Sequence, residues 1–257
     1  MSLTDAELER YARHIVLPQI GGPGQRKLKS SRVAIVGAGA IGSAVIPALA
    51  GAGVGHLTII DDDAVELSNL HRQLIFREDQ VGQSKAKIAA GFVAALNSDV
   101  EAVAISERIG GDNAERLLSA FDMVLDGTDN FATRLTTNQA CVDLRLPLIS
   151  AAAAQFQGQL ALFRGWQPDQ PCYRCFVGDA FDSDDCDACS ELGVVGALAG
   201  SVGHLAALLA VRALLNIGGD LAGTLFVMDG MSLSWRSMKL PKDGGCRTCG
   251  GVDAATS

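Results

Sequence analysis

Short apolar runs alternate with longer segments in which apolar residues recur every three or four positions. A short, mostly apolar run predicts a buried strand, and the three-to-four-residue spacing predicts an amphipathic helix. The first part of the chain therefore predicts strands at 32–36, 56–60, 100–105, 121–125 and 146–150, with helices ending near 52, at 84–97, after 112 and at 131–144. Strands and helices that alternate in this way predict an α/β fold: a Rossmann-like, mostly parallel sheet with helices on both faces.

The two ends of the chain depart from this alternation. Thr4-Asp-Ala-Glu7 predicts a helix capping box, and Gly21-Gly-Pro-Gly24 is expected to end a helical segment within 1–30. After Gly158 the pattern predicts a strand at 159–163, a loop to about 189, an apolar helix at 192–215 and strands at 224–228 and 232–238, which we expect to form an antiparallel part. We predict one domain over 1–257, with halves at 31–157 and 158–257.

Composition and charge restrict the class of protein. Apolar residues make up 48% of the chain and charged residues 19%, so much of the chain is expected to be buried. The net charge of -8 argues against nucleic-acid binding, which needs a basic surface. The polar N-terminus shows no signal peptide, so we expect a cytoplasmic protein. In that reducing compartment seven cysteines favour metal binding or catalysis over disulfides.

The apolar segment 192–215 is long enough to cross a membrane. Its Gly196 and Gly200 have the Gly-x-x-x-Gly spacing found between packed membrane helices. However, His204 and Arg212 interrupt the segment, and no second segment resembles it. We therefore predict a buried helix of a soluble fold, with no membrane partner, whose small residues admit the close approach of another helix.

Gly37-x-Gly39-x-x-Gly42 follows the first predicted strand and opens a helix. Such a loop binds phosphate through the unpaired N–H groups and the dipole of the helix N-terminus, and its glycines permit a tight turn. Asp61, at the end of the next strand, can accept hydrogen bonds from ribose hydroxyls. A nucleotide site is therefore predicted, with a ligand-free turn as the alternative, and the loop alone does not distinguish NAD from ATP.

Four features around the same predicted sheet favour ATP. They are Asn69 and Arg72 after the acidic strand end, Lys85 at the start of the next helix, Asp129 after a further strand, and Arg13 near the N-terminus. The cations can reach phosphates, and a carboxylate at a strand end can hold Mg²⁺. Each feature alone has a structural explanation, such as a solvated charge or a helix cap at Asp129-Asn130, so the prediction rests on the set.

Together these motifs resemble the adenylating enzymes that activate ubiquitin-like sulfur-carrier proteins, the MoeB/ThiF/HesA family. The resemblance extends over about 7–250. It is carried by Arg10-Tyr-Ala-Arg-His14, Gly37-Ala-Gly-Ala-Ile-Gly42, Ile60-Asp-Asp-Asp63, Ser68-Asn-Leu-His-Arg-Gln73, Val81-Gly-Gln-Ser-Lys85, Asp126-Gly-Thr-Asp-Asn130, Pro171-Cys-Tyr-Arg-Cys175 and Cys246-Arg-Thr-Cys249.

The resemblance implies that the C-terminal Gly-Gly carboxylate of a carrier protein attacks the α-phosphate of Mg-ATP, giving an acyl-adenylate and pyrophosphate. This carboxylate is ionised near neutral pH, so catalysis would consist of positioning and charge neutralisation. The implied nucleotide-binding residues are Gly37, Gly39, Gly42, Asp61, Asp63, Asn69, Arg72, Gln73, Lys85, Asp129 and Asn130. Arg72, Lys85 and Asp129 would also act in catalysis, and Arg13 would reach into the partner subunit's site of a homodimer.

Three Cys-x-x-Cys pairs occur: Cys172/Cys175, Cys186/Cys189 and Cys246/Cys249. Two such pairs would bind Zn²⁺ through four thiolates. The spacing leaves open which two pairs do so, and it also permits free thiols or redox pairs. The resemblance assigns a structural zinc to the first and third pairs, Cys172, Cys175, Cys246 and Cys249, in the half that would also bind the carrier.

Cys189 aligns with the family position that in some members forms a covalent link to the carrier and in others is dispensable. It falls on a predicted crossover loop at about 176–192. Neighbouring aspartates between Asp179 and Asp187 disfavour a thiolate, whereas the N-terminus of the following helix favours one. Cys189 is therefore a candidate catalytic nucleophile with both outcomes open.

The leading prediction is thus a homodimeric, ATP- and Mg²⁺-dependent adenylyltransferase for a sulfur carrier of the molybdopterin or thiamine type. The chain contains no rhodanese-type segment, so we expect a separate sulfur donor. The alternatives are an NAD-dependent oxidoreductase, a non-catalytic binding module of the same fold, and a family member that adenylates a peptide or a tRNA base. The low basic charge weakens the tRNA alternative.

Overall fold

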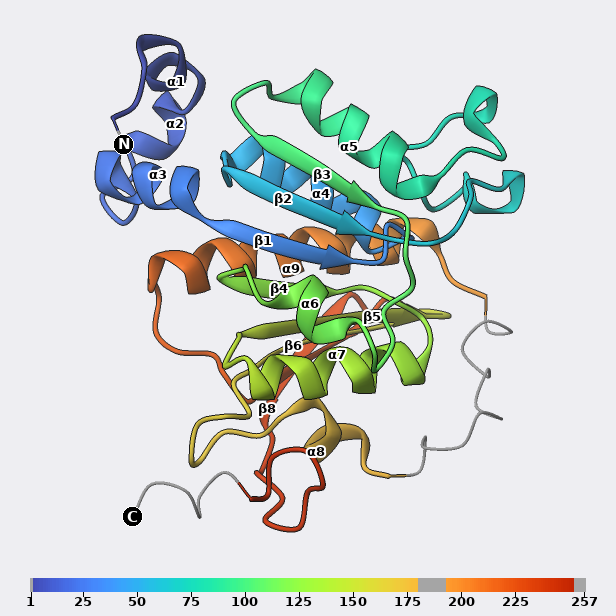
Figure 1. Ribbon diagram of the computed structural model, residues 1–257. Helices are drawn as coiled ribbons and strands as arrows, with labels where there is room; N and C mark the ends of the chain where they lie inside the picture. The colour runs from blue at the N-terminus through green and yellow to red at the C-terminus, as the bar shows by residue number, and fades with distance from the viewer. Residues whose placement is uncertain (1, 180–192, 252–257) are drawn as a thin grey trace.

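The computed structural model describes residues 2–179 and 193–251, and an eight-stranded sheet runs through them (Figure 1). The strand order is β3-β2-β1-β4-β5-β6-β7-β8. The strands are β1 (Arg32–Val36), β2 (His56–Ile60), β3 (Glu101–Ile105), β4 (Met123–Asp126), β5 (Leu148–Ala154), β6 (Gln157–Phe163), β7 (Thr224–Asp229) and β8 (Ser234–Lys239). The pairs among β1 to β5 are parallel and those from β5 to β8 are antiparallel, which confirms the predicted fold class.

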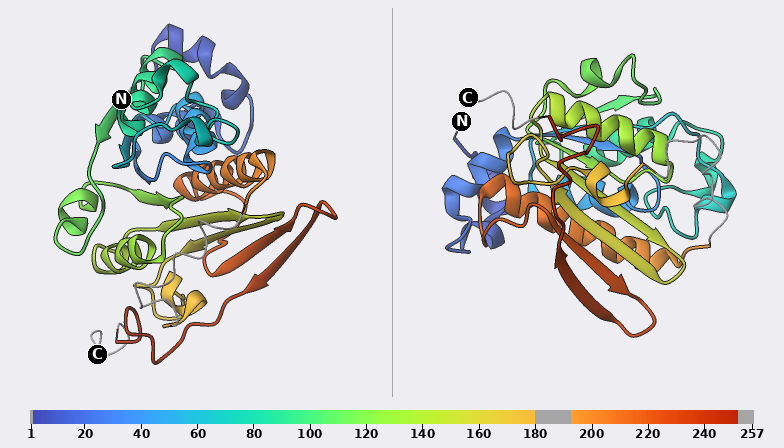
Figure 2. Two further views of the ribbon diagram at one scale, coloured as in Figure 1. Left: turned by 90° about the vertical axis from the view of Figure 1, so that its right-hand side faces the viewer. Right: turned by 90° about the horizontal axis from the view of Figure 1, so that it is seen from below.

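Helices cover both faces of the sheet (Figure 2). The described helices are α1 (Asp5–Arg10), α2 (Ala12–Ile15), α3 (Gly21–Ser30), α4 (Gly42–Ala52), α5 (Lys85–Leu96), α6 (Ala114–Leu118), α7 (Phe131–Asp143), α8 (Tyr173–Val177) and α9 (Gly196–Leu215). One core joins the sheet to α4, α5 and α9, and the other joins it to α6, α7 and α8. The central strand β1 is buried on both faces, because Val33 and Ile35 enter the first core and Ala34 and Val36 the second.

By its length and composition alone, helix α9 could cross a membrane. It packs against α4, β5 and β6, and its Leu198, Val202 and Leu209 are buried in the first core, as predicted for a helix of a globular fold. Among the small residues predicted to admit another helix, Gly203 permits the close approach to α4: a Cβ on Gly203 would lie 2.8 Å from Ala44 Cβ, whereas nothing lies within 4 Å of one on Gly200.

Two details of the predicted elements were wrong. Gly21-Gly-Pro-Gly24 begins α3 instead of ending a helical unit: Gly21 has a positive φ of 58°, and Pro23 stands in the first turn, where its missing N–H has no acceptor to lose. The loop predicted after Phe163 contains the short helix α8, whose five residues are too few to give a periodic pattern.

Candidate functional site

A cavity of about 880 Å³ opens at the carboxyl ends of β1, β2 and β4. The chain proceeds from β1 to β2 and β3 on one side, and then crosses to β4 on the other side of β1. Ligands of open α/β sheets bind at such a reversal of strand order. Of the predicted site residues, the cavity is lined by Gly37, Gly39, Asp61, Asp63, Arg72, Gln73, Lys85, Asp129 and Asn130.

The glycine loop has the backbone shape that its sequence predicts. Gly37 has a positive φ of 89°, and a Cβ there would lie 3.1 Å from Thr128 Cγ2. A Cβ on Gly42 would overlap the carbonyl oxygen of Gly37, because the first turn of α4 folds back on the loop. The N–H groups of Ser43, Ala44 and Val45 bond to the carbonyls of Gly39 and Ile41, so α4 offers the cavity the positive end of its dipole, beside the lining loop 39–41.

Gly42→Ala is expected to weaken ATP binding by tenfold or more, since forcing a methyl group against backbone costs roughly 1–3 kcal/mol. Gly51→Ala, at the other end of the same helix, is the matched control, because nothing lies within 4 Å of a Cβ there. The control should bind ATP as the unmodified protein does. Calorimetric titration with ATP measures both, and equal affinities for the two variants would contradict this account of the loop.

Asp61 holds the glycine loop in place. Its Oδ2 accepts from the N–H of Ala38 at 2.6 Å, and its Oδ1 accepts from the N–H of Asp63 at 2.9 Å. Burial raises the pKa of the Asp61 carboxyl, and these two hydrogen bonds oppose the shift. Each carboxylate oxygen keeps acceptor capacity for a ligand hydroxyl.

Lys85 is a buried ammonium in the cavity wall. It is 5% exposed, and its Nζ lies 2.8 Å from Asp63 Oδ2, its one ion-pair partner among the described residues. A lysine has three N–H donors, so two remain for a ligand. A buried charge with donors to spare is costly unless an anion joins it, which favours a phosphate at this position.

Arg72 is held by its backbone surroundings. Its Nη1 donates to the carbonyl of Ser68 at 2.9 Å, and Gly196 of α9 packs against its main chain, with a Cβ there 3.1 Å from Arg72 Cα. Asn69 and Gln73 are buried, and Asn69 Oδ1 and Gln73 Oε1 have no hydrogen-bond partner among the described residues. Gln73 lines the cavity, whereas the side chain of Asn69 does not.

Asp129 and Asn130 both line the cavity at the start of α7. Asp129 is exposed, so its carboxylate is available to a cation. Asn130 is the N-cap of α7, and its Oδ1 accepts from the N–H of Thr133 at 2.8 Å. The capping explanation therefore holds for Asn130, and its side-chain amide keeps its donors for a ligand.

The sequence interpretation missed Arg134 and Asp126. Arg134 is buried, and it donates to the carbonyls of Thr128 and Ala151 and to Ser150 Oγ. Asp126 Oδ1 accepts from the N–H and hydroxyl of Thr128, which fixes the same loop. Arg134 lies four residues after Asn130, so the helical repeat places both on one face of α7, and that spacing was the available signal.

Arg13 lies outside the cavity of its own chain. It is exposed on α2, and no described residue pairs with it. The segment is anchored to the C-terminal end of α4: Asn97 Nδ2 donates to Tyr11 Oη at 2.8 Å and to the carbonyl of Ala50 at 2.7 Å. The cavity lies at the N-terminal end of α4, about 16 Å away along a helix of this length.

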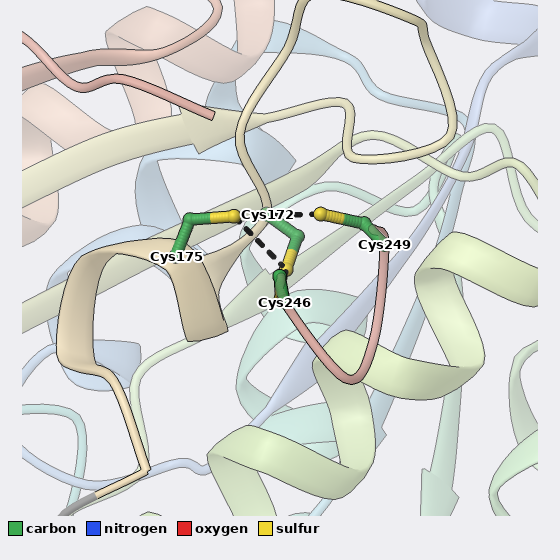
Figure 3. Close-up of side chains that lie close together, drawn as sticks. All are labelled: Cys172, Cys175, Cys246 and Cys249. Atoms are coloured by element: carbon green, nitrogen blue, oxygen red, sulfur yellow. Dashed lines mark hydrogen bonds between the residues drawn. The ribbon is translucent and has the colours of Figure 1, made fainter. Parts of the chain in front are cut away.

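The first and third cysteine pairs lie 74 residues apart in the sequence and come together in the structure (Figure 3). All four Sγ atoms lie within 4.8 Å of one another, with Cys172 and Cys246 at 3.6 Å and Cys175 and Cys249 at 3.4 Å. Four sulfurs around one Zn²⁺ are spaced by about 3.8 Å, given Zn–S distances near 2.3 Å. The donor set and its spacing fit a tetrahedral zinc site. The predicted nucleophile Cys189, and Cys186, lie outside the described residues.

Hydrogen-bond donors beside two of the cysteines favour negative sulfur, and burial of the cluster opposes it. Asn138 Nδ2 donates to Cys172 Sγ and the N–H of Asp243 donates to Cys175 Sγ, each at 3.5 Å. The hydrogen bond with Cys172 lowers the pKa of Cys175 to about 5, and burial raises the pKa of Cys249 to about 12. Four thiols so close together, three of them buried, would repel one another as thiolates, and a divalent cation removes that repulsion.

Known proteins resemble this chain over nearly its whole length. The model of the ThiF family matches residues 11–248. The SAMP-activating enzyme E1 of Haloferax volcanii is 40% identical over 256 residues, covering 99% of this chain and 94% of that protein. The sulfur carrier protein ThiS adenylyltransferase of Escherichia coli is 41% identical over 253 residues, covering 98% and 99%. Adenylyltransferase and sulfurtransferase MOCS3 of Aedes aegypti is 42% identical, and the chain spans 56% of its length.

The fold also occurs in a solved structure. The crystal structure of E. coli MccB with ATP has a TM-score of 0.82 to this chain at 23% identity, covering 96% of this chain and 75% of MccB. This likeness shows a shared fold.

Proposed function

The chain belongs to the ThiF family and is an adenylyltransferase, and we propose that it joins AMP from ATP to the C-terminal Gly-Gly carboxylate of a ubiquitin-like sulfur-carrier protein. The observation that carries the proposal is the single cavity in which Lys85, Arg72, Asp61 and Asp129 meet the N-terminal end of α4. Cations and a helix N-terminus suit phosphates, and carboxylates suit a ribose and a divalent cation.

Within this cavity the ribose hydroxyls would donate to Asp61 and Asp63. The buried oxygen of Gln73, which lines the cavity and lacks a partner among the described residues, would be satisfied by a donor of the nucleotide or its water. Lys85 and Arg72 would hold phosphate oxygens, and the N-terminal end of α4 would add its positive dipole. Asp129 would hold Mg²⁺, which neutralises part of the triphosphate charge.

The reaction needs no strong base. A carrier carboxylate oxygen forms a bond to the α-phosphorus, and the bond from that phosphorus to the bridging oxygen of pyrophosphate breaks. The extra negative charge in the transition state lies on phosphate oxygens beside Lys85 and Arg72. These fixed donors therefore stabilise the transition state more than the ground state, which is the requirement for catalysis.

Arg13 supports a homodimer with shared sites. It is exposed and lines no part of its own cavity, and its segment is anchored at the C-terminal end of α4, a helix about 16 Å long whose other end meets the cavity. A second copy related by a two-fold axis can supply the guanidinium to this cavity and receive one in return. We further propose a cytoplasmic enzyme that works with a separate sulfur donor.

The four-cysteine cluster would hold Zn²⁺ in a structural role. It joins the segment after β6 to the segment after β8, and it packs against Val142 of α7. The metal would hold these two segments together in place of apolar packing.

The decisive experiment is exchange of labelled pyrophosphate into ATP. We expect exchange that depends on Mg²⁺ and on a ubiquitin-like carrier ending in Gly-Gly, and none with a carrier whose final glycine is deleted. Calorimetric titration with NAD tests the oxidoreductase alternative. Tight NAD binding without carrier-dependent exchange would overturn the proposal, and exchange driven by a short peptide alone would change the substrate class.

A further inference from the structure

His71 lines the cavity beside Arg72, and its imidazole contacts the guanidinium of that arginine. Arg72 Nη1 lies 2.9 Å from His71 Nε2 and 2.9 Å from the carbonyl oxygen of Ser68. Arginine has donors but no acceptor, so the imidazole nitrogen is the acceptor of this hydrogen bond. The imidazole is therefore neutral in this arrangement, and its ring proton is on Nδ1.

The main chain of Arg72 is fixed by its neighbours. Its N–H donates to the carbonyl of Asn69 at 3.0 Å, which closes a tight turn and brings the Ser68 carbonyl within reach of the guanidinium. Gly196, at the start of α9, packs against this turn: a Cβ there would lie 2.5 Å from the carbonyl oxygen of His71 and 3.1 Å from Arg72 Cα. The part of Arg72 that still has to be oriented is its long side chain.

The two side-chain contacts use every donor of one guanidinium nitrogen. Nη1 carries two N–H groups, and Ser68 and His71 accept one each. The other three N–H groups, one on Nε and two on Nη2, form no hydrogen bond with the described residues. Nε and Nη2 together make one edge of the guanidinium, and such an edge binds two oxygens of a phosphate through parallel hydrogen bonds. Ser68 and His71 thus hold one corner of the group and leave this edge for a ligand.

Two acceptors fix the guanidinium more firmly than one. With the Ser68 carbonyl alone, the planar group could turn about a single contact, because the arginine side chain has several rotatable bonds. A second acceptor on the same nitrogen opposes this rotation. An arginine ordered in advance loses less conformational entropy when it binds a phosphate, and its donors meet the transition-state charge without reorganisation.

We propose that His71 is a positioning residue for the adenylation reaction: by accepting from Nη1, it orients Arg72 so that the Nε and Nη2 donors bind the phosphates of ATP. The proposal rests on the proposed function, since it takes Arg72 to hold phosphate oxygens. His71 itself needs no contact with the nucleotide in this role.

The test compares two substitutions of similar size, His71→Gln and His71→Met. Glutamine keeps an acceptor near the end of its side chain, whereas the thioether of methionine accepts only weakly. We expect the ATP Kd, measured by calorimetric titration, to rise roughly three- to tenfold in H71M, the effect of one net hydrogen bond, and to change less than twofold in H71Q. Both variants should keep the original melting temperature, because His71 is exposed.

A double-mutant cycle separates positioning from a direct contact between His71 and the nucleotide. In an Arg72→Ala background, His71→Met should change the ATP Kd by less than twofold, because the guanidinium that His71 orients is gone. Equal losses with and without Arg72 would overturn the proposal. An H71Q variant as weak as H71M, or an H71M variant that binds ATP like the unmodified protein, would overturn it as well.

Pyrophosphate exchange with the same variants distinguishes this proposal from the proposed function. The kcat/KM for ATP should follow the pattern of the ATP Kd. If H71M weakened ATP binding and H71Q did not, while the unmodified protein showed no carrier-dependent exchange, the positioning role of His71 would stand and the carrier would be excluded as the substrate.

Discussion

Lys85→Ala is expected to reduce carrier-dependent pyrophosphate exchange by about 10²–10³-fold, the cost of one lost donor to a developing oxyanion. The effect should be large because Lys85 is 5% exposed and is anchored 2.8 Å from Asp63, so no solvent cation can take its place. The loss should appear mainly in the maximal rate, since the charge it meets grows in the transition state.

Lys87→Ala is the matched control, because Lys87 is exposed on the same helix two residues away. It should retain full exchange activity and the same melting temperature. If Lys87→Ala lost as much exchange activity as Lys85→Ala, the loss would reflect the overall positive charge of α5 and not the position of Lys85. If neither variant lost activity, Lys85 would have no role in the reaction.

Lys85→Ala, combined with Arg13→Ala, also tests whether the site is shared between two chains. Arg13→Ala should be as impaired as Lys85→Ala. Mixing the two variants should restore about one quarter of the activity, because half of the redistributed dimers are mixed and each has one complete site. No recovery after confirmed subunit exchange would place Arg13 outside the partner's site.

Cys249→Ser is expected to abolish zinc binding and to lower the melting temperature by about 10 °C. A structural zinc contributes about 10–16 kcal/mol in zinc-finger peptides. This chain keeps two large apolar cores without the metal, so we expect the loss of a smaller part, roughly 3–5 kcal/mol, and a domain of this size shifts by about 2–4 °C per kcal/mol.

The control is Gly244→Ala, in the same segment, where nothing lies within 4 Å of an added Cβ. It should keep one bound zinc per chain and the original melting temperature. Metal content by mass spectrometry and calorimetric melting separate the two variants. A chelated, zinc-free protein that melts at the original temperature would contradict the structural role.

Local features of this protein were predictable because they depend on neighbours in sequence. Strands 32–36 and 56–60 were correct to the residue, since a run of apolar residues between turn residues marks a strand buried on both faces. The turn at Gly37 and the helix start at Gly42 follow from backbone sterics that only glycine satisfies. The wrong details had different causes: α8 has only five residues, too few for a periodic pattern, whereas Gly21 and Pro23 read as turn residues although they form the first turn of α3.

The tertiary structure alone brought together residues that are far apart in the chain. Spacing left open which two cysteine pairs meet, and the contact between Cys172 and Cys246 depends on the path of the 74 residues between them. Likewise, β5 continues four positions beyond its last pair with β4, and Arg134, sixteen residues before Ser150, donates to the carbonyl of Ala151 on that stretch.

The sequence by itself thus determined the order of strands and helices, the glycine loop and the set of charges that a nucleotide site needs. These follow from periodicity and local sterics, which act over a few residues. The tertiary structure decided which charges share a cavity, which cysteines form a cluster, and that Arg13 lies at the far end of α4 from its own cavity. Those relations depend on packing between elements distant in sequence, which no local pattern records.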